Sequence, residues 1–145
     1  MRVLIIVHLE PEFERTVGVL VMDSLVKKVV RYAKDFDNVI NVYSLDDRLF
    51  YQQLKPFVQQ QWIWGFDYAY YTTDEESKDY WEEGKNWIRT TGHVASEIAN
   101  WMQALSKKDT YTLVGGARSE CLQDVYDIFN HLELKTKIKE SLTYD

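Results

Sequence analysis

Apolar runs and amphipathic stretches alternate along much of the chain. Val3–Val7 is a continuous run of Leu and β-branched side chains, which is typical of a strand covered on both faces. In the stretch Val17–Tyr32, apolar side chains recur every three or four residues, and this spacing predicts an amphipathic helix. A turn at Asp37 and Asn38 then leads into a second short strand, Val39–Tyr43. The first third of the chain is therefore predicted to fold as strand, helix and strand.

The same alternation returns in the second half. Strands are expected at Trp87–Thr90, Thr110–Val114 and Leu134–Ile138, the last an edge strand, with helices over Val94–Leu105 and from the N-cap Ser119 to Leu132. Between Leu45 and Tyr80 the pattern indicates only a short helix, Arg48–Leu54. Strands that alternate with helices imply right-handed parallel crossovers. We therefore predict one α/β domain over residues 1–145, a three-layer α/β/α sandwich with a mainly parallel, Rossmann-like sheet.

Composition and charge narrow the class of protein. The chain is 46% hydrophobic and 28% charged, as globular proteins are, and 145 residues suffice for one core. A net charge of −6 argues against nucleic acid and anionic membranes as partners, because both require clustered Lys and Arg. The opening apolar run of about seven residues is too short for a signal peptide or a membrane span. The single cysteine excludes an intrachain disulfide, which fits a reducing compartment, so we expect a cytoplasmic protein.

Polar residues follow each of the first four predicted strands. In parallel α/β sheets, ligands bind beyond the carboxyl ends of the strands. The residues at these ends are His8 and Glu10; Asp46 and Asp47; Thr91, Gly92 and His93; and Gly115, Gly116, Arg118, Glu120 and Cys121. We expect them to line one rim, where most of them would contact a small-molecule ligand.

Cys121 is the strongest candidate for a catalytic nucleophile. In the predicted helix it occupies the first turn, where free backbone N–H groups and the helix dipole stabilise a thiolate. His93 or His8 would then serve as the base. The charge of the adjacent Glu120 opposes a thiolate, and a lone cysteine at a helix start is also commonly a small buried hydrophobe. Both interpretations of Cys121 stay open.

Neither the pair Gly115-Gly116 nor the histidines match a known cofactor-binding or metal-binding motif. A glycine pair between a strand and a helix can cradle an anion or supply oxyanion donors, but the P-loop Lys and the third glycine of a dinucleotide fingerprint are missing. His8, Glu10, His93 and Glu120 show no HxH, HxxxH or CxxC spacing. We therefore expect neither a metal nor a cofactor, and a metal-dependent hydrolase on His8, Glu10 and His93 is the weaker alternative.

The aromatic stretch Trp62–Tyr71 is the densest in the chain. It is interpreted either as a lid or oligomer contact packed on the sheet, or as a stacking wall for a flat ligand, with Trp64 among the contacts.

Two segments carry a family resemblance. LIIVHLEPEF resembles the first strand and loop of the isochorismatase-like cysteine hydrolases, and LVGGARSECLQDVYDIFNHLELKTKI resembles their strand, glycine turn, cysteine-bearing helix and next strand. Gly115 stands six residues before Cys121, as a glycine does in that family. The match covers about a third of the chain. It implies a Cys–Asp–Lys triad, a thioester intermediate, an oxyanion hole near a cis peptide in the glycine turn, and dimers or larger homo-oligomers.

Residue by residue, the resemblance carries over the nucleophile, Cys121. The acidic residue of the family falls on His8 here, and its lysine falls near Arg89, so the triad is altered. The resemblance implies a hydrolase of small amide or ester-like substrates, with His93 or His8 as base and Arg89 or Arg118 as anion contact. The alternative is a catalytically inactive binding or interaction protein on the same scaffold. WIWG, TTGH and GGARSEC also resemble segments of small phage-encoded proteins.

Overall fold

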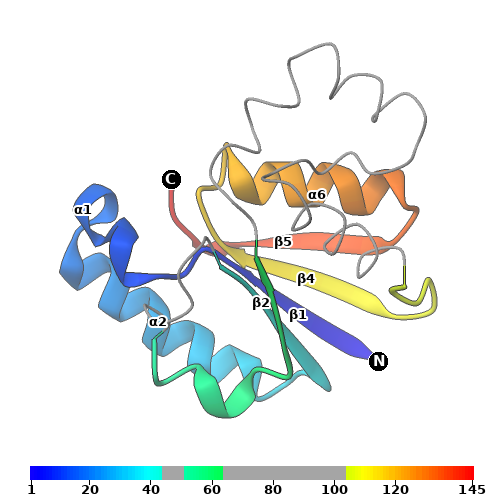
Figure 1. Ribbon diagram of the computed structural model, residues 1–145, viewed down its shortest axis with the longest axis horizontal. Coiled ribbons are helices and arrows are strands. Elements are labelled where there is room, and N and C mark those ends of the chain that lie inside the picture. The colour runs from blue at the N-terminus through cyan, green and yellow to red at the C-terminus, as the bar shows by residue number, and fades with distance from the viewer. Residues whose placement is uncertain (44–50, 64–103) are drawn as a thin grey trace.

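The computed structural model describes residues 1–43, 51–63 and 104–145. Within these residues five strands form one parallel sheet in the order β3-β2-β1-β4-β5 (Figure 1). The strands are β1 (Arg2–Val7), β2 (Asn38–Tyr43), β3 (Gln60–Ile63), β4 (Thr110–Gly115) and β5 (Lys135–Thr143). The predicted α/β fold with parallel strands is confirmed.

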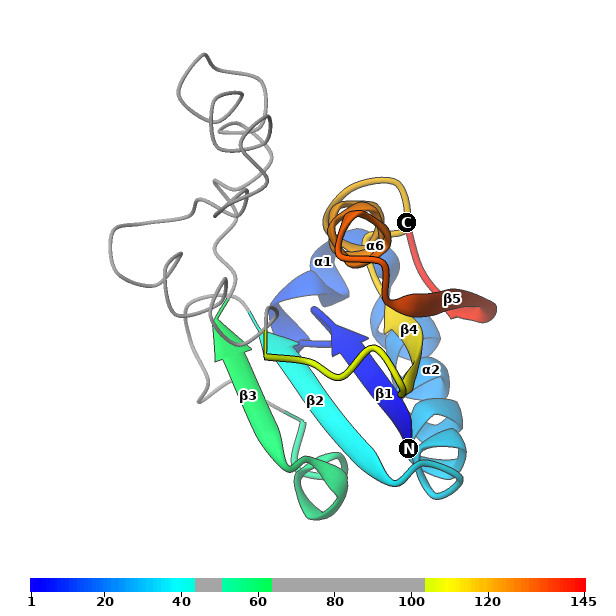
Figure 2. The same ribbon diagram turned by 90° about the vertical axis from the view of Figure 1, so that its right-hand side faces the viewer.

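Helices connect the strands and lie on both faces of the sheet. The described helices are α1 (Glu14–Val17), α2 (Val19–Ala33) and α6 (Cys121–His131), with 3-10 turns η1 (Pro11–Phe13) and η3 (Lys55–Phe57). Figure 2 shows α2 on one side of β1 and β4 and α6 on the other. None of the described helices combines the length and apolarity that crossing a bilayer requires.

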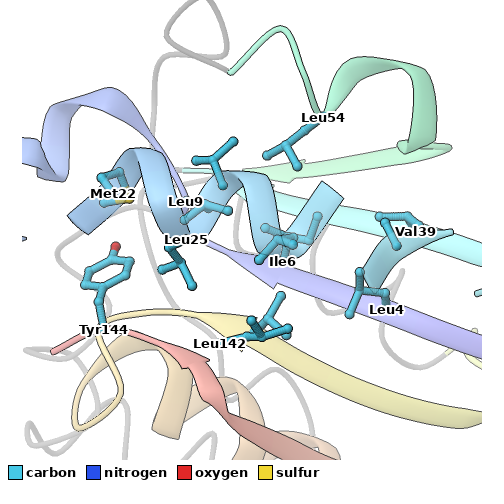
Figure 3. Packing of buried hydrophobic residues seen from close by; sticks show 13 residues of the cluster. Leu4, Ile6, Leu9, Met22, Leu25, Val39, Leu54, Leu142 and Tyr144 are labelled. Atoms are coloured by element: carbon cyan, nitrogen blue, oxygen red, sulfur yellow. The ribbon is translucent and has the colours of Figure 1, made fainter. Parts of the chain in front are cut away.

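The central strand β1 supplies two separate apolar clusters. Successive side chains of a strand point to opposite faces, so Val3, Ile5 and Val7 pack under α6, whereas Leu4 and Ile6 pack against α2. Figure 3 shows the cluster on the α2 side. The continuous apolar run of β1 follows from this burial on both faces.

Most strand predictions agree with the structure to within one or two residues. The predicted Val3–Val7, Val39–Tyr43 and Thr110–Val114 correspond to β1, β2 and β4. The predicted edge strand is present but runs on to Thr143, where the sequence pattern suggested an end at Ile138.

Two other predictions about local structure were wrong. The helix expected over 17–32 is divided by Gly18, whose φ of 100° and ψ of 140° are not helical, so α2 begins at Val19. Ser119 is not the N-cap of α6, because Glu120 holds that position and the Ser119 hydroxyl donates to Asp145 instead.

The remaining predictions fall mostly on residues outside the described ones. These are the strand Trp87–Thr90, nearly all of the helix Val94–Leu105, and the first part of the helix Arg48–Leu54. Residues 52–54 form a turn before η3 rather than a helix. The structure also adds β3, which the sequence pattern did not indicate.

Candidate active site

His8 follows β1 directly and turns out of the line of the strand. Its N–H still donates to the Val42 carbonyl at 2.8 Å, so the pairing with β2 continues for one residue. Its φ is 47°, in the left-handed region that residues other than glycine seldom adopt. This conformation changes the direction of the chain at the carboxyl edge of the sheet, where His8 is fully buried.

Glu10 is the hydrogen-bond partner of the His8 ring. Nδ1 of His8 lies 3.0 Å from Oε2 of Glu10, and both side chains are shielded from solvent. Because a carboxylate only accepts hydrogen bonds, Nδ1 carries the proton. The other ring nitrogen, Nε2, is then the position at which His8 exchanges a proton with a reacting group.

Cys121 is the first residue of α6 and lies close enough to His8 to influence the pKa of its imidazole. The two residues are far apart in sequence, but β1 and β4 are neighbours in the sheet and Val7 pairs with Gly115. The loops that follow these two strands therefore meet. The thiol is partly exposed and is not in a disulfide.

The charges around His8 favour its protonated form. Burial alone would lower the pKa of His8, but its interactions with Cys121 and Glu10 outweigh burial and raise the pKa from 6.5 to about 9. At neutral pH the imidazole of His8 therefore carries a positive charge beside Cys121. The three groups therefore form a chain, thiol to imidazole to carboxylate.

The glycine turn holds the two loops close together. Gly115 has a φ of 101°, and a Cβ there would lie 2.1 Å from the Val7 carbonyl oxygen. The N–H of Gly116 donates to that same oxygen at 2.9 Å. The peptide bond between Gly116 and Ala117 is cis, in the turn where the resemblance implies such a bond.

Some backbone N–H groups near Cys121 donate a hydrogen bond within the protein, and others do not. Gly116, Arg118 and Ser119 donate to Val7, Tyr144 and Asp145 respectively. Among the described residues, no acceptor is found for the N–H groups of Ala117 and Cys121. The N–H of Gly116 is therefore occupied, whereas those of Ala117 and Cys121 have no acceptor among the described residues and could donate to a ligand.

Tyr144 and Phe13 also belong to this site, and sequence reasoning missed both. The Tyr144 hydroxyl donates to the His8 carbonyl, and the ring of Phe13 lies 5.5 Å from that of His8 and 6.1 Å from that of Tyr144. The signal was available in part. A parallel strand extended to Thr143 would have ended at the same rim as β1 and β4, with Tyr144 next.

Other predicted contacts lie elsewhere. The Arg118 guanidinium forms hydrogen bonds of 2.9 to 3.1 Å with Glu140 on β5, so it is already engaged by a carboxylate and the role expected of it as an anion contact is not supported. Glu120 is exposed. Trp64, Arg89, Thr91, Gly92 and His93 lie outside the described residues.

The arrangement can perform nucleophilic chemistry with its own side chains. A thiol lies beside an imidazole, and a buried carboxylate is hydrogen-bonded to that imidazole. In the described residues, no group of three or more His, Cys, Asp or Glu side chains is placed to hold a metal ion. No family model, curated protein or solved structure matches the chain.

Proposed function

We propose that this protein is an isochorismatase-like cysteine hydrolase of a small amide or ester-like substrate. The observation that carries the proposal is the grouping of Cys121, His8 and Glu10, in which the fully buried His8 and Glu10 are hydrogen-bonded to each other and Cys121 influences the pKa of His8. Nucleophile, base and orienting carboxylate are the three parts of a hydrolytic triad, which is defined by geometry rather than by sequence order.

Each residue takes a defined step. Cys121 reacts as a thiolate beside the imidazolium of His8, and the sulfur attacks the substrate carbonyl carbon. The negative oxygen that forms is held by the N–H groups of Ala117 and Cys121. The imidazolium of His8 then protonates the leaving amine or alcohol as the carbonyl reforms in a thioester. Finally the neutral His8 takes a proton from water, the hydroxide cleaves the thioester, and the acid leaves as the thiolate and imidazolium are restored.

Glu10 stabilises the imidazolium that exists between these transfers. It accepts from Nδ1 and so keeps Nε2 available to the sulfur and to the leaving group. In this proposal the His8–Glu10 pair does the work that an aspartate and a lysine do in the family that the sequence resembles.

The proposal includes the finer description of the fold. The helices α2 and α6 on opposite faces of the sheet, with β1 central, support a three-layer α/β/α sandwich of Rossmann-like type. In such sheets the carboxyl ends of the strands form the ligand site, and this is the edge at which His8 and Cys121 lie.

The test is acyl transfer from p-nitrophenyl acetate together with alkylation by iodoacetamide. We expect a burst of p-nitrophenol in wild type and a single labelled cysteine. The burst should disappear in Cys121→Ala, and its rate should fall about a hundredfold or more in His8→Gln. Glu10→Gln should retain the burst at a reduced rate, because it removes only the orienting charge.

Two results would contradict the proposal. One is a wild-type protein without a burst whose folded cysteine resists iodoacetamide at pH 7. The other is a burst that persists in Cys121→Ala. Either would favour the alternative of a binding protein on the same scaffold. The exposed, helix-borne His131→Gln is the matched control and should behave as wild type.

A further inference from the structure

The proposed nucleophile and base lie on two separate loops. His8 belongs to the loop after β1, and Cys121 lies at the end of the turn after β4. Hydrolysis needs the sulfur and the imidazole in contact, so a small shift of one loop against the other would separate them. Something must hold both loops in register beyond the ends of the strands.

Tyr144, just beyond β5, contacts both loops. Its hydroxyl donates to the carbonyl of His8. Its ring lies against Gly116, where a Cβ would come within 2.7 Å of ring atoms. Its own N–H donates to the Gly115 carbonyl at 2.9 Å, and its carbonyl accepts from the N–H of Arg118 at 2.8 Å.

The neighbouring Asp145 extends the same attachment toward Cys121. Oδ1 of Asp145 accepts from the Ser119 N–H at 3.1 Å and from the Ser119 hydroxyl at 2.6 Å. The segment 144–145 therefore contacts four of the five positions from Gly115 to Ser119, the turn that leads to the nucleophile.

We propose that Tyr144 is a positioning residue, which clamps the His8 loop to the Gly116 turn and so keeps the imidazole on the Cys121 sulfur. The proposal is based on the geometry of one side chain, which is only 8% exposed. The Tyr144 hydroxyl is hydrogen-bonded to the His8 loop, and its ring packs directly on the Gly116 turn. Its catalytic meaning rests on the proposed function, but the clamp itself does not.

The unusual backbone of His8 explains why such a clamp is needed. A left-handed residue other than glycine costs about 1–2 kcal/mol and persists only where its surroundings fix it. The bond from Tyr144 fixes the carbonyl of this very residue. Tyr144 also belongs to the apolar cluster on the α2 side of the sheet, which anchors its ring (Figure 3).

The Tyr144 hydroxyl stays a donor over the whole working range of pH. Burial, followed by the charges of Glu10 and Cys121, raises the pKa of Tyr144 well above its usual value. The described titratable groups that face His8 are Glu10 from its own loop, Cys121 from α6 and Tyr144 from the end of β5.

The test is Tyr144→Phe, which keeps the ring and removes the hydroxyl. Without its bond the His8 loop relaxes, and the imidazole loses contact with Cys121 and Glu10 while it remains buried. We expect the pKa of His8, followed by NMR of histidine-labelled protein and assigned with His8→Gln, to fall by about one unit or more from its wild-type value. Alkylation of Cys121 by iodoacetamide at pH 7 should slow about tenfold.

Tyr111→Phe is the matched control. The Tyr111 hydroxyl also donates to a backbone carbonyl, that of Ser106 at 2.7 Å, but near the opposite ends of the strands. Both variants lose one comparable hydrogen bond, so urea unfolding should give similar losses of stability. A structural role alone would leave the pKa of His8 the same in both.

The outcomes separate the clamp from the chemistry. A lowered pKa of His8 in Tyr144→Phe but not in Tyr111→Phe supports the clamp, even if wild type shows no burst with p-nitrophenyl acetate. An unchanged pKa in Tyr144→Phe, or the same fall in both variants, overturns the clamp, even where the burst is present.

Discussion

At the scale of single residues, backbone contacts at the ends of β1 and β4 determine whether a site can form. Gly115 approaches the Val7 carbonyl so closely that any side chain would push the two strand ends apart. The N–H of the next residue, Gly116, donates to that oxygen, and the absence of a side chain at Gly116 leaves room for the Tyr144 ring. The glycine pair is therefore required for close approach as well as for chain direction.

Gly115→Ala should destabilise the protein by about 3–4 kcal/mol, because a strained φ is combined with a steric clash: the added Cβ would lie only 2.1 Å from the Val7 carbonyl oxygen. Gly18→Ala is the matched control. Its φ of 100° is almost the same, but a Cβ there would meet nothing within 4 Å, so strain alone should cost about 1–3 kcal/mol. Urea unfolding measures both, and equal losses would show that the contact with Val7 is unimportant.

Residue types at the strand ends were sufficient to predict part of the site. His8, Glu10 and Cys121 were expected on one rim, and the structure brings these three together. Tyr144 could not be found in this way. After Ile138 the alternation of apolar and polar residues fails, because the pairing of β4 with β5 shifts register between Leu113 and Gly115.

At the scale of elements, α6 carries an acidic residue in an unfavourable place. Asp124 lies one turn after Cys121, and its Oδ2 is buried with no hydrogen-bond partner among the described residues. Burial, with the charges of Asp127 and Glu120, raises the pKa of Asp124 from 3.8 to about 7. The folded protein therefore holds this proton more tightly than the unfolded chain does.

Asp124→Asn should stabilise the protein above pH 7. A raised carboxyl pKa means that the contribution of Asp124 to stability is greatest below about pH 4 and is lost as the pH rises to about 7. Allowing for partial exposure, we expect the variant to gain about 1–2 kcal/mol at pH 8 and little at pH 4 in urea unfolding. Asp23→Asn, on the exposed side of α2, should show no such rise with pH.

The sequence pattern predicted some strands and helices correctly and missed others. Apolar runs identified β1, β2 and β4 because these strands are covered by side chains from one or both faces. The short strand β3, with the polar opening Gln60-Gln61, has no such pattern and depends on its pairing with β2. The break at Gly18 was missed because the apolar spacing continues through it.

At the scale of the whole molecule, stability depends on β1. Its alternate side chains enter two apolar clusters on opposite faces of the sheet, and β1 is the middle strand in the sheet order. The strand therefore connects the two cores. Both neighbours of β1 are themselves paired further out, to β3 and β5.

Leu4→Ala should therefore cost about 2–5 kcal/mol in urea unfolding, since Leu4 is fully buried in the cluster of Figure 3. Leu20→Ala removes the same atoms from a side chain that is 84% exposed, and should change stability by less than about 0.5 kcal/mol. Comparable losses in the two variants would contradict the described packing of β1 and α2.

The pairing of Arg2 with Thr110 has a consequence for how the chain is made. A ribosome that adds about 5–20 residues per second needs roughly 5–20 seconds to travel from one partner to the other. During that interval β2 can pair with one edge of β1, but β4, the partner of the other edge, has not been synthesised. Nascent chains of this protein should therefore be clients of chaperones that shield open strand edges until β4 is synthesised.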